Sequence, residues 1–143
     1  MTDRVRRPKH YEDFMAELKD SGSFDTLKDA LVFAACLGLG RNQKVSFKDS
    51  AEPIPIQYFR AEFDKMIINT IAIRDTGDPM VMADARSDES IKIFEEYACG
   101  GLEVMNNLIA GSQFSVEEAL IDLVMSTQKS GKILDEITSL GSM

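Results

Sequence analysis

The sequence predicts a mainly α-helical, multi-helix compact domain that opens with a short extended segment. Apolar residues recur every three or four positions through most of the chain, which is the spacing of one face of an α-helix. All four prolines fall outside these periodic stretches, as expected of a residue that breaks helices. With 143 residues, 44% of them hydrophobic, the chain can bury a core without metals or disulfides.

The beginning of the chain predicts the order strand, helix, helix. Residues 3–7 form a short extended segment, and a proline then opens an amphipathic helix over residues 9–20. Asp25 or Thr26 can cap the next helix, because a short polar side chain accepts hydrogen bonds from the first turn. This second helix carries no charge over residues 30–39 and ends in glycine. We therefore expect it to be buried on nearly all sides.

The rest of the chain predicts further helices after a proline-containing stretch. Residues 52–56 include two prolines and must run extended. Helices are expected over residues 57–75 and 87–110, with a short helical turn between them. The pair Gly100-Gly101 inside the latter costs helix propensity, which predicts a kink or a tight helix crossing. Two shorter helices are expected at residues 115–128 and 132–140.

The proline-containing stretch is the best internal boundary. Residues 49–58 connect an N-terminal unit, residues 1–48, to a helical C-terminal unit, residues 59–143, although one continuous domain is the alternative. The net charge of −8 is uneven, since residues 1–50 carry +1 and residues 51–143 carry −9. This asymmetry predicts opposite roles, a slightly basic surface for a polyanion and an acidic surface for a protein.

The residue inventory argues against a self-sufficient catalytic site. His10 is the only histidine, and the sequence contains no glycine-rich phosphate loop. We expect no catalytic residues, no metal site and no cofactor. A magnesium-dependent nuclease is the alternative, although the candidate carboxylates fall at turns and helix caps. These carboxylates are Asp75, Asp78, Asp84, Asp88 and Glu89.

The two cysteines and the hydropathy predict a cytoplasmic protein. Cys36 and Cys99 each stand among small apolar residues, which is typical of reduced, buried thiols. No stretch of about 18 apolar residues occurs, so no membrane span is expected. The charged N-terminus lacks the apolar segment of a signal peptide.

The basic start of the chain is the candidate DNA-binding segment. Side chains alternate along a strand, which places Arg4 and Arg6 on one face and Arg7 on the other. Arginines in a strand can read guanine edges or hold the phosphates of double-stranded DNA. A solubilising N-terminal tail is the alternative. The candidate DNA-binding residues are Arg4, Arg6, Arg7, Lys9 and His10.

A family resemblance is carried by four stretches of the sequence, residues 4–11, 31–38, 52–56 and 93–102. They resemble the Dnd system-associated protein 4 family, which accompanies bacterial DNA phosphorothioation modification and restriction loci. The resemblance implies antiviral defence as the context and other Dnd-system proteins as partners. It assigns no catalytic residues to this sequence. The strand, helix, helix order also resembles DndE-like ribbon-helix-helix proteins, in which two chains pair their strands into a ribbon for the DNA major groove.

These observations together predict a non-catalytic accessory protein of a DNA phosphorothioation defence system. We expect it to bind double-stranded DNA through its basic start and to form a homo-oligomer whose core is the uncharged second helix. The alternative is an adaptor or regulator that docks on a larger modification or restriction component through the acidic helical half. The sequence leaves both functions open.

Overall fold

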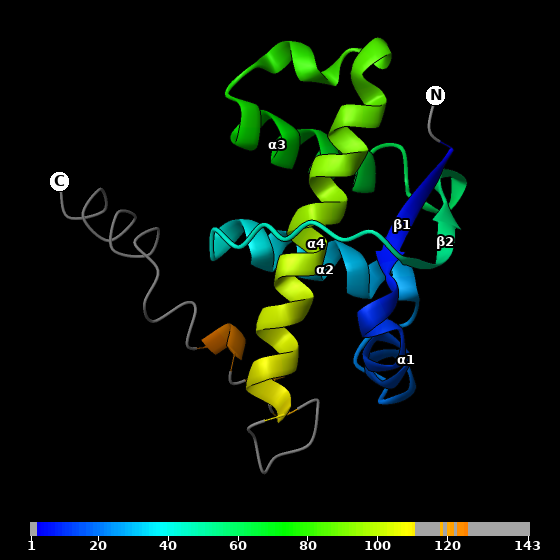
Figure 1. Ribbon diagram of the computed structural model, residues 1–143, viewed down its shortest axis with the longest axis vertical. Coiled ribbons are helices and arrows are strands. Elements are labelled where there is room, and N and C mark those ends of the chain that lie inside the picture. Colours follow the sequence, from blue (N-terminus) through cyan, green and yellow to red (C-terminus); the bar gives the residue numbers. More distant parts are fainter. Residues whose placement is uncertain (1–2, 111–117, 119, 122, 126–143) are drawn as a thin grey trace, which may run out of the picture.

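The fold is organised around one long helix, α4 (Ser87–Ala110), which runs the length of the molecule (Figure 1). Helix α2 (Leu27–Gly40) crosses it near the middle, and α3 (Asp64–Thr76) lies beside its N-terminal end. The computed structural model describes residues 3–110, 118, 120–121 and 123–125. This mainly helical architecture, with an extended start, confirms the predicted fold class.

The N-terminal strand β1 (Arg4–Pro8) pairs antiparallel with β2 (Ser50–Pro55) of the same chain. Val5 lies opposite Ile54, and the register then shifts by a bulge before Arg7. The predicted extended course of the proline-containing stretch is confirmed, and so is the alternation of side chains along β1. Arg4 is exposed and Arg6 is half-buried, whereas Val5 and Arg7 are buried.

This pairing corrects the comparison with ribbon-helix-helix proteins, which predicts that the strand pairs with a second copy of the chain. Here β2 supplies the partner, because its prolines hold it extended and its backbone meets that of β1. The likeness therefore ends at the order of the elements. That order is confirmed: after β1 come a 3-10 turn (Lys9–Tyr11), α1 (Glu12–Asp20) and α2.

Helix α2 begins and packs largely as its sequence predicts. The Thr26 hydroxyl accepts a hydrogen bond from the Asp29 N–H at 3.1 Å, so Thr26 is the cap. The expectation that α2 is buried on nearly all sides is wrong. Ala34 and its neighbours face the core, but Cys36 is exposed and Phe33 is only half-buried. A helix without charges still has an outer side wherever the chain supplies nothing to cover it.

Glycines allow α2 and α4 to cross closely, which confirms the tight crossing predicted for Gly100-Gly101. A Cβ atom on Gly101 would overlap the carbonyl oxygen of Ala34 in α2, and one on Gly38 would overlap the carbonyl oxygen of Tyr97 in α4. A Cβ atom on Gly100 would meet the backbone of the loop that follows α2. The two helices therefore touch backbone to backbone, and no other residue fits at these positions without a shift.

The third helix begins later than predicted. Residues 56–58 form a 3-10 turn, and α3 starts only at Asp64. The Asp64 carboxylate accepts a hydrogen bond from the Arg60 N–H at 2.7 Å, which closes a turn just before the helix. Phe59 is extended and buried against Phe94 of α4. The ring is buried in the core by an extended backbone at Phe59, so the helix begins only after this residue.

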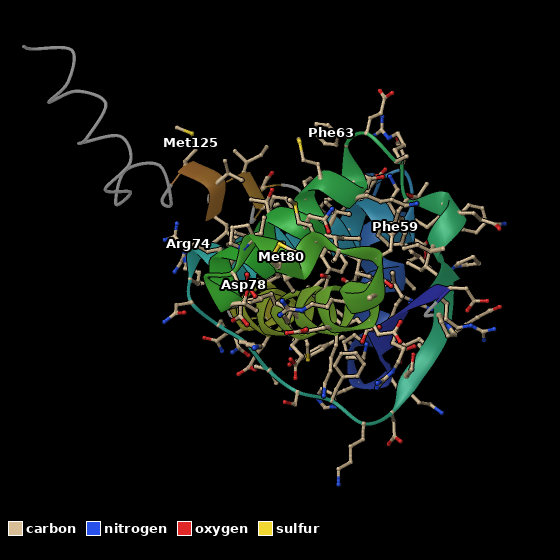
Figure 2. The ribbon with its side chains drawn as sticks, turned by 90° about the horizontal axis from the view of Figure 1, so that it is seen from above. Phe59, Phe63, Arg74, Asp78, Met80 and Met125 are labelled. Atoms are coloured by element: carbon tan, nitrogen blue, oxygen red, sulfur yellow. The ribbon has the colours of Figure 1, made fainter. Side chains whose placement is uncertain are left out.

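Large apolar side chains at the start of the third helix are exposed. The exposed fractions of Phe63 and Met66 are 56% and 55%. Met80, in the 3-10 turn Pro79–Met82 after α3, is 67% exposed. Phe63 lies at the edge of the fold in Figure 2. Phe59 lies within the fold in the same view. The end of the molecule near α3 therefore presents large apolar side chains.

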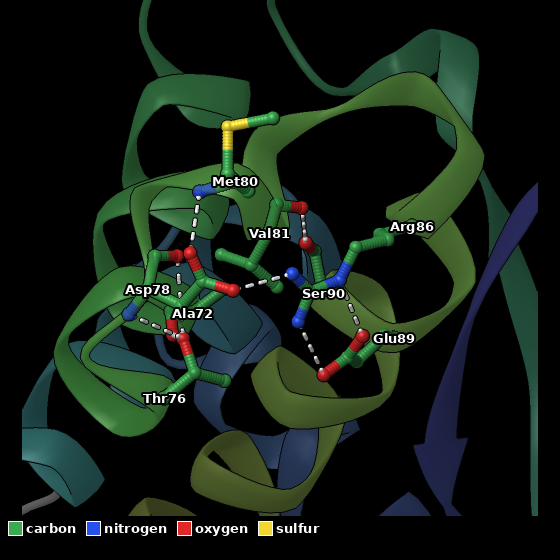
Figure 3. Close-up of polar contacts among 8 residues, drawn as sticks. All are labelled: Ala72, Thr76, Asp78, Met80, Val81, Arg86, Glu89 and Ser90. Atoms are coloured by element: carbon green, nitrogen blue, oxygen red, sulfur yellow. Dashed lines mark hydrogen bonds and ion pairs between the residues drawn. The ribbon is translucent and has the colours of Figure 1, made fainter.

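A polar network fixes the connection between α3 and α4 (Figure 3). The Arg86 guanidinium donates to Asp78 at 2.7 Å and to Glu89 at 2.9 Å. The Asp78 carboxylate also accepts from the Met80 N–H, and the Ser90 hydroxyl donates to the Val81 carbonyl. These bonds hold the predicted short helical turn against the first turn of α4.

The core draws on both halves of the chain. Residues from β1, α1, α2, α3 and α4 contribute to one cluster of buried apolar side chains. Among the described positions near the C-terminus, which are helical, Leu120 and Leu123 are buried. Most of the helix predicted over residues 115–128, and all of that predicted over residues 132–140, lie outside the described residues. None of the helices in the described part of the chain is long and apolar enough to cross a membrane.

The two cysteines should react at very different rates with a thiol reagent. The prediction that both are buried is wrong for Cys36, which is exposed, and right for Cys99. Burial, with the nearby charges of Glu103 and Glu96, raises the pKa of the Cys99 thiol to about 11. Partial desolvation also raises the pKa of Cys36. We expect one thiol to be labelled in the native protein near pH 8.5 and the second only after unfolding. Cys36→Ser should abolish the native signal, and labelling that persists in this variant would contradict the assignment.

Candidate nucleic-acid interface

The five predicted DNA-binding residues divide between the surface and the interior. Arg4, Lys9 and His10 are exposed, and Arg6 is half-buried. Only 6% of Arg7 is exposed. Because β1 packs its Val5 and Arg7 side onto the core, the structure brings four of the five to the outer side and turns one inward.

Arg6 is held in place by the loop that follows α2. Its guanidinium donates to the carbonyl oxygens of Phe47 at 3.2 Å and Lys48 at 3.0 Å, and it lies over the Phe47 ring at 4.8 Å. These contacts tie the loop to β1. They also bring the backbone of Lys48 next to the predicted basic segment, although no periodic pattern in the sequence marks it.

Arg7 points to the other side of the sheet. Its Nε donates to the Glu52 carbonyl oxygen at 2.9 Å, and its Nη1 lies 3.8 Å from the sulfur of Met15. Within the described residues it forms no ion pair. The guanidinium therefore belongs to the inner side of β1, away from Arg4 and Lys9.

The outer side presents a surface that we call the basic face, made of Arg4, Arg6, Lys9, His10 and Lys48. A shallow hollow of about 280 Å³ opens between Lys9, His10, Phe47 and Asp49. Arg4 pairs with Asp3 at 3.3 Å, but both side chains are largely exposed, so this pair is weak. The side chains of Lys9 and Lys48 make no ion pair with any described residue. Their charges are therefore available to an anion.

Carboxylates border the basic face and limit its extent. Glu95 of α4 is 4% exposed, and its Oε2 accepts the Arg6 N–H at 2.6 Å. Burial raises the pKa of this carboxyl, and the hydrogen bond from Arg6 offsets part of the rise. Glu96 accepts from the Ser46 hydroxyl at 3.0 Å and lies 3.9 Å from Lys44. The face can therefore hold a few phosphates at defined points, but it cannot coat a polyanion broadly.

Among the carboxylates named for the nuclease alternative, Asp75, Asp78 and Glu89 bind side chains of the protein. Asp75 accepts from the Tyr97 hydroxyl at 2.7 Å and from Lys44 at 3.1 Å. Desolvation, followed by the bond to Asp75, raises the pKa of Tyr97 to about 12. Asp78 and Glu89 share Arg86. In the described part of the chain, no group of three side chains of the metal-binding kinds gathers at one point.

Comparison with known proteins gives one match. No curated protein and no solved structure is similar enough to this chain to count as a match. The model of one protein family, described as DNA sulphur modification system-associated protein 4, matches residues 4–140. The match begins at β1, includes the basic face and covers nearly the whole chain. The protein therefore belongs to the DNA sulphur modification system-associated protein 4 family, as the resemblance of its sequence predicts.

Proposed function

We propose that this protein is a non-catalytic, cytoplasmic accessory component of a DNA sulphur modification system that contacts double-stranded DNA through its basic face. The family description supports the system, and the geometry of β1 supports the contact. One observation carries the proposal. Arg6 is anchored by two carbonyl oxygens beside Lys9 and Lys48, whose ammonium groups have no anionic partner among the described residues.

Preorganisation is what makes this arrangement suited to phosphate. The opposite side of β1 is fixed in the core, so the backbone that carries the cations is already ordered before DNA arrives. Cations that need no ordering lose less conformational entropy on binding than cations on a mobile tail. Contacts of this kind position a protein on DNA without reading its sequence. We therefore expect salt-dependent binding with little sequence preference.

Removing two of these cations should lower both the affinity for DNA and its salt dependence. For Lys9→Ala/Lys48→Ala, the slope of log Kobs against log salt should decrease in magnitude by about 2, since each lost phosphate contact contributes about 0.9. Fluorescence anisotropy of a labelled duplex, titrated at several salt concentrations, measures this slope. No binding by the wild-type protein at low salt would refute the proposal.

A charge-matched control separates a local contact from the effect of net charge. Lys65 and Arg74 are exposed cations of α3 that form no ion pair with the described residues, and Arg74 lies across the molecule from β1 in Figure 2. Lys65→Ala/Arg74→Ala removes the same charge as the test variant. If this control weakens binding as much as Lys9→Ala/Lys48→Ala does, DNA is not held at the basic face.

An adaptor function is the second candidate, supported by a different surface. Residues 51–143 carry a net charge of −9, and large apolar side chains are exposed on α3 and the turn after it. Exposed apolar side chains rimmed by charge are typical of protein interfaces. The anisotropy experiment discriminates between the two functions. Failure to bind DNA, together with co-purification with other proteins of the modification system, would favour the adaptor.

A further inference from the structure

A second cavity lies on the inner side of the β1–β2 pair. It has a volume of about 400 Å³ and opens between β2, the end of α1 and the start of α2. Its walls include the two prolines of β2 and one carboxylate-bearing residue, Glu52. The other residues that matter for its chemistry are the apolar Leu27, Ile54 and Tyr58 and the cationic Arg7, Lys19 and Lys28.

Arg7 is the unusual member of this cavity. A buried charge is normally paired, because transfer from water to the protein interior costs several kcal/mol. Among the described residues, the hydrogen-bond partners of the Arg7 guanidinium are a carbonyl oxygen and a thioether sulfur, and its Nη2 makes no hydrogen bond. Every fully buried side-chain nitrogen or oxygen in the described part of the chain has a hydrogen-bond partner. Because Nη2 of Arg7 has none, it is not fully buried, and it reaches the open space of the cavity.

Two further sources of positive charge face the same space. Lys19 is exposed and forms no ion pair among the described residues. Leu27 and Lys28 are the first two residues of α2, and N–H groups in the first turn of a helix have no partner within that helix. Lys28 itself is already balanced by Asp64 at 2.7 Å and Asp29 at 3.0 Å. The cations of the cavity that form no ion pair with the described residues are therefore Arg7 and Lys19.

We propose that this cavity is a binding site for a phosphate-class anion. Arg7 would be its principal ligand, Lys19 would close the open side, and the first turn of α2 would donate backbone hydrogen bonds. The site is distinct from the basic face, because β1 separates Arg7 from Arg6 and sends their guanidinium groups to opposite sides. It does not depend on DNA contact at that face.

The arrangement of donors favours phosphate over a carboxylate. Donors come from residues of three separate elements in the cavity wall, β1, α1 and α2. A tetrahedral anion has acceptor oxygens in several directions, whereas the two oxygens of a carboxylate lie in one plane. The planar guanidinium binds two phosphate oxygens at once and is only weakly hydrated, which suits a cavity with apolar walls.

Titration of the whole protein with inorganic phosphate, followed by calorimetry and by amide NMR shifts at constant ionic strength, tests the proposal. We expect saturable binding, with shifts at Arg7 and at the start of α2. Lys19→Gln should weaken binding about tenfold, whereas Glu52→Gln should strengthen it, because Glu52 is the only acidic residue among the described ones in the cavity wall. Both side chains are exposed, so neither variant should disturb folding. Arg74→Gln, which removes an exposed cation of α3 outside the cavity wall, should leave phosphate binding unchanged.

The results distinguish the possible sources of the bound phosphate group, and some of them would refute the proposed site. If phosphate competes with duplex DNA and Lys19→Gln weakens this competition, the group belongs to a nucleic acid backbone; if phosphate binds without competing, it belongs to a small molecule. Both results support the site, and neither depends on whether the Lys9 and Lys48 variants alter DNA binding. The proposal is overturned if wild-type protein shows no saturable binding, if acetate binds more tightly than phosphate, or if Lys19→Gln and Glu52→Gln leave the affinity unchanged.

Discussion

Replacing Gly101 with alanine should destabilise the protein by at least about 3 kcal/mol. The added Cβ atom would overlap the carbonyl oxygen of Ala34, which belongs to the backbone of α2 and cannot rotate away. Alanine favours helices by roughly 1 kcal/mol over glycine, so the loss arises from helix packing and outweighs a gain in propensity. Urea denaturation followed by far-ultraviolet circular dichroism measures the free energy of unfolding.

Gly40→Ala provides the matched control for this prediction. Gly40 is the last residue of α2, and a Cβ atom there would meet nothing within 4 Å. We expect this variant to be unchanged or up to about 1 kcal/mol more stable, because the substitution reduces the entropy of the unfolded chain. If Gly101→Ala and Gly40→Ala behave alike, α2 and α4 do not cross as closely as described.

Asp64→Asn should cost about 3 kcal/mol of stability by breaking a buried ion pair. The Asp64 side chain is 3% exposed and accepts from the Lys28 ammonium and from the Arg60 N–H, each at 2.7 Å. Its loss leaves the buried Lys28 with only Asp29, which is partly exposed. Thermal and urea denaturation at pH 7 measure the loss.

The pH dependence of stability checks the same pair. Burial alone would raise the pKa of the Asp64 carboxyl, but the hydrogen bonds from Lys28 and Arg60 outweigh it and leave the pKa below its ordinary 3.8. A carboxyl with a lowered pKa contributes stability above its ordinary pKa and loses it as the pH falls through the lowered value. Asp64→Asn should remove this part of the acid transition.

A double variant separates the stability that comes from the ion pair from the stability that comes from the volume its side chains fill. Lys28→Met/Asp64→Leu leaves no unpaired charge, so it should be less destabilised than Asp64→Asn. The double variant could instead lose as much stability as Lys28→Met and Asp64→Leu added together. This result would show that the two side chains are not energetically coupled and would contradict the 2.7 Å contact between them.

Local signals in the sequence were sufficient for much of the fold. The alternation of Arg6 and Arg7 and the cap at Thr26 depend on geometry within a few residues. The close approach at Gly101 joins two distant helices, but the glycine pair inside a helix is a local signal for it. The start of the third helix could not be predicted in this way. It depends on the burial of Phe59 against α4, a contact between residues far apart in the chain.

The candidate site was predictable only in part for the same reason. The exposed positions of Arg4 and Lys9 follow from their place on the strand and the turn after it. The inward course of Arg7 depends on a carbonyl group of β2, and the contribution of Lys48 depends on a carbonyl bond to Arg6. Neither contact leaves a pattern in the sequence, because each joins segments about forty residues apart.

Glu95 has a consequence for how copies of this protein can meet. The backbone of Arg6 points away from β2, and a strand with unpaired N–H groups on its outer edge is a template for another chain. The Glu95 carboxylate occupies that N–H group from α4. Pairing of β1 with a second molecule would have to displace a buried carboxylate and leave it without its donor. The carboxylate thus protects the edge against unwanted β-sheet extension, and any oligomer is expected to form through other surfaces.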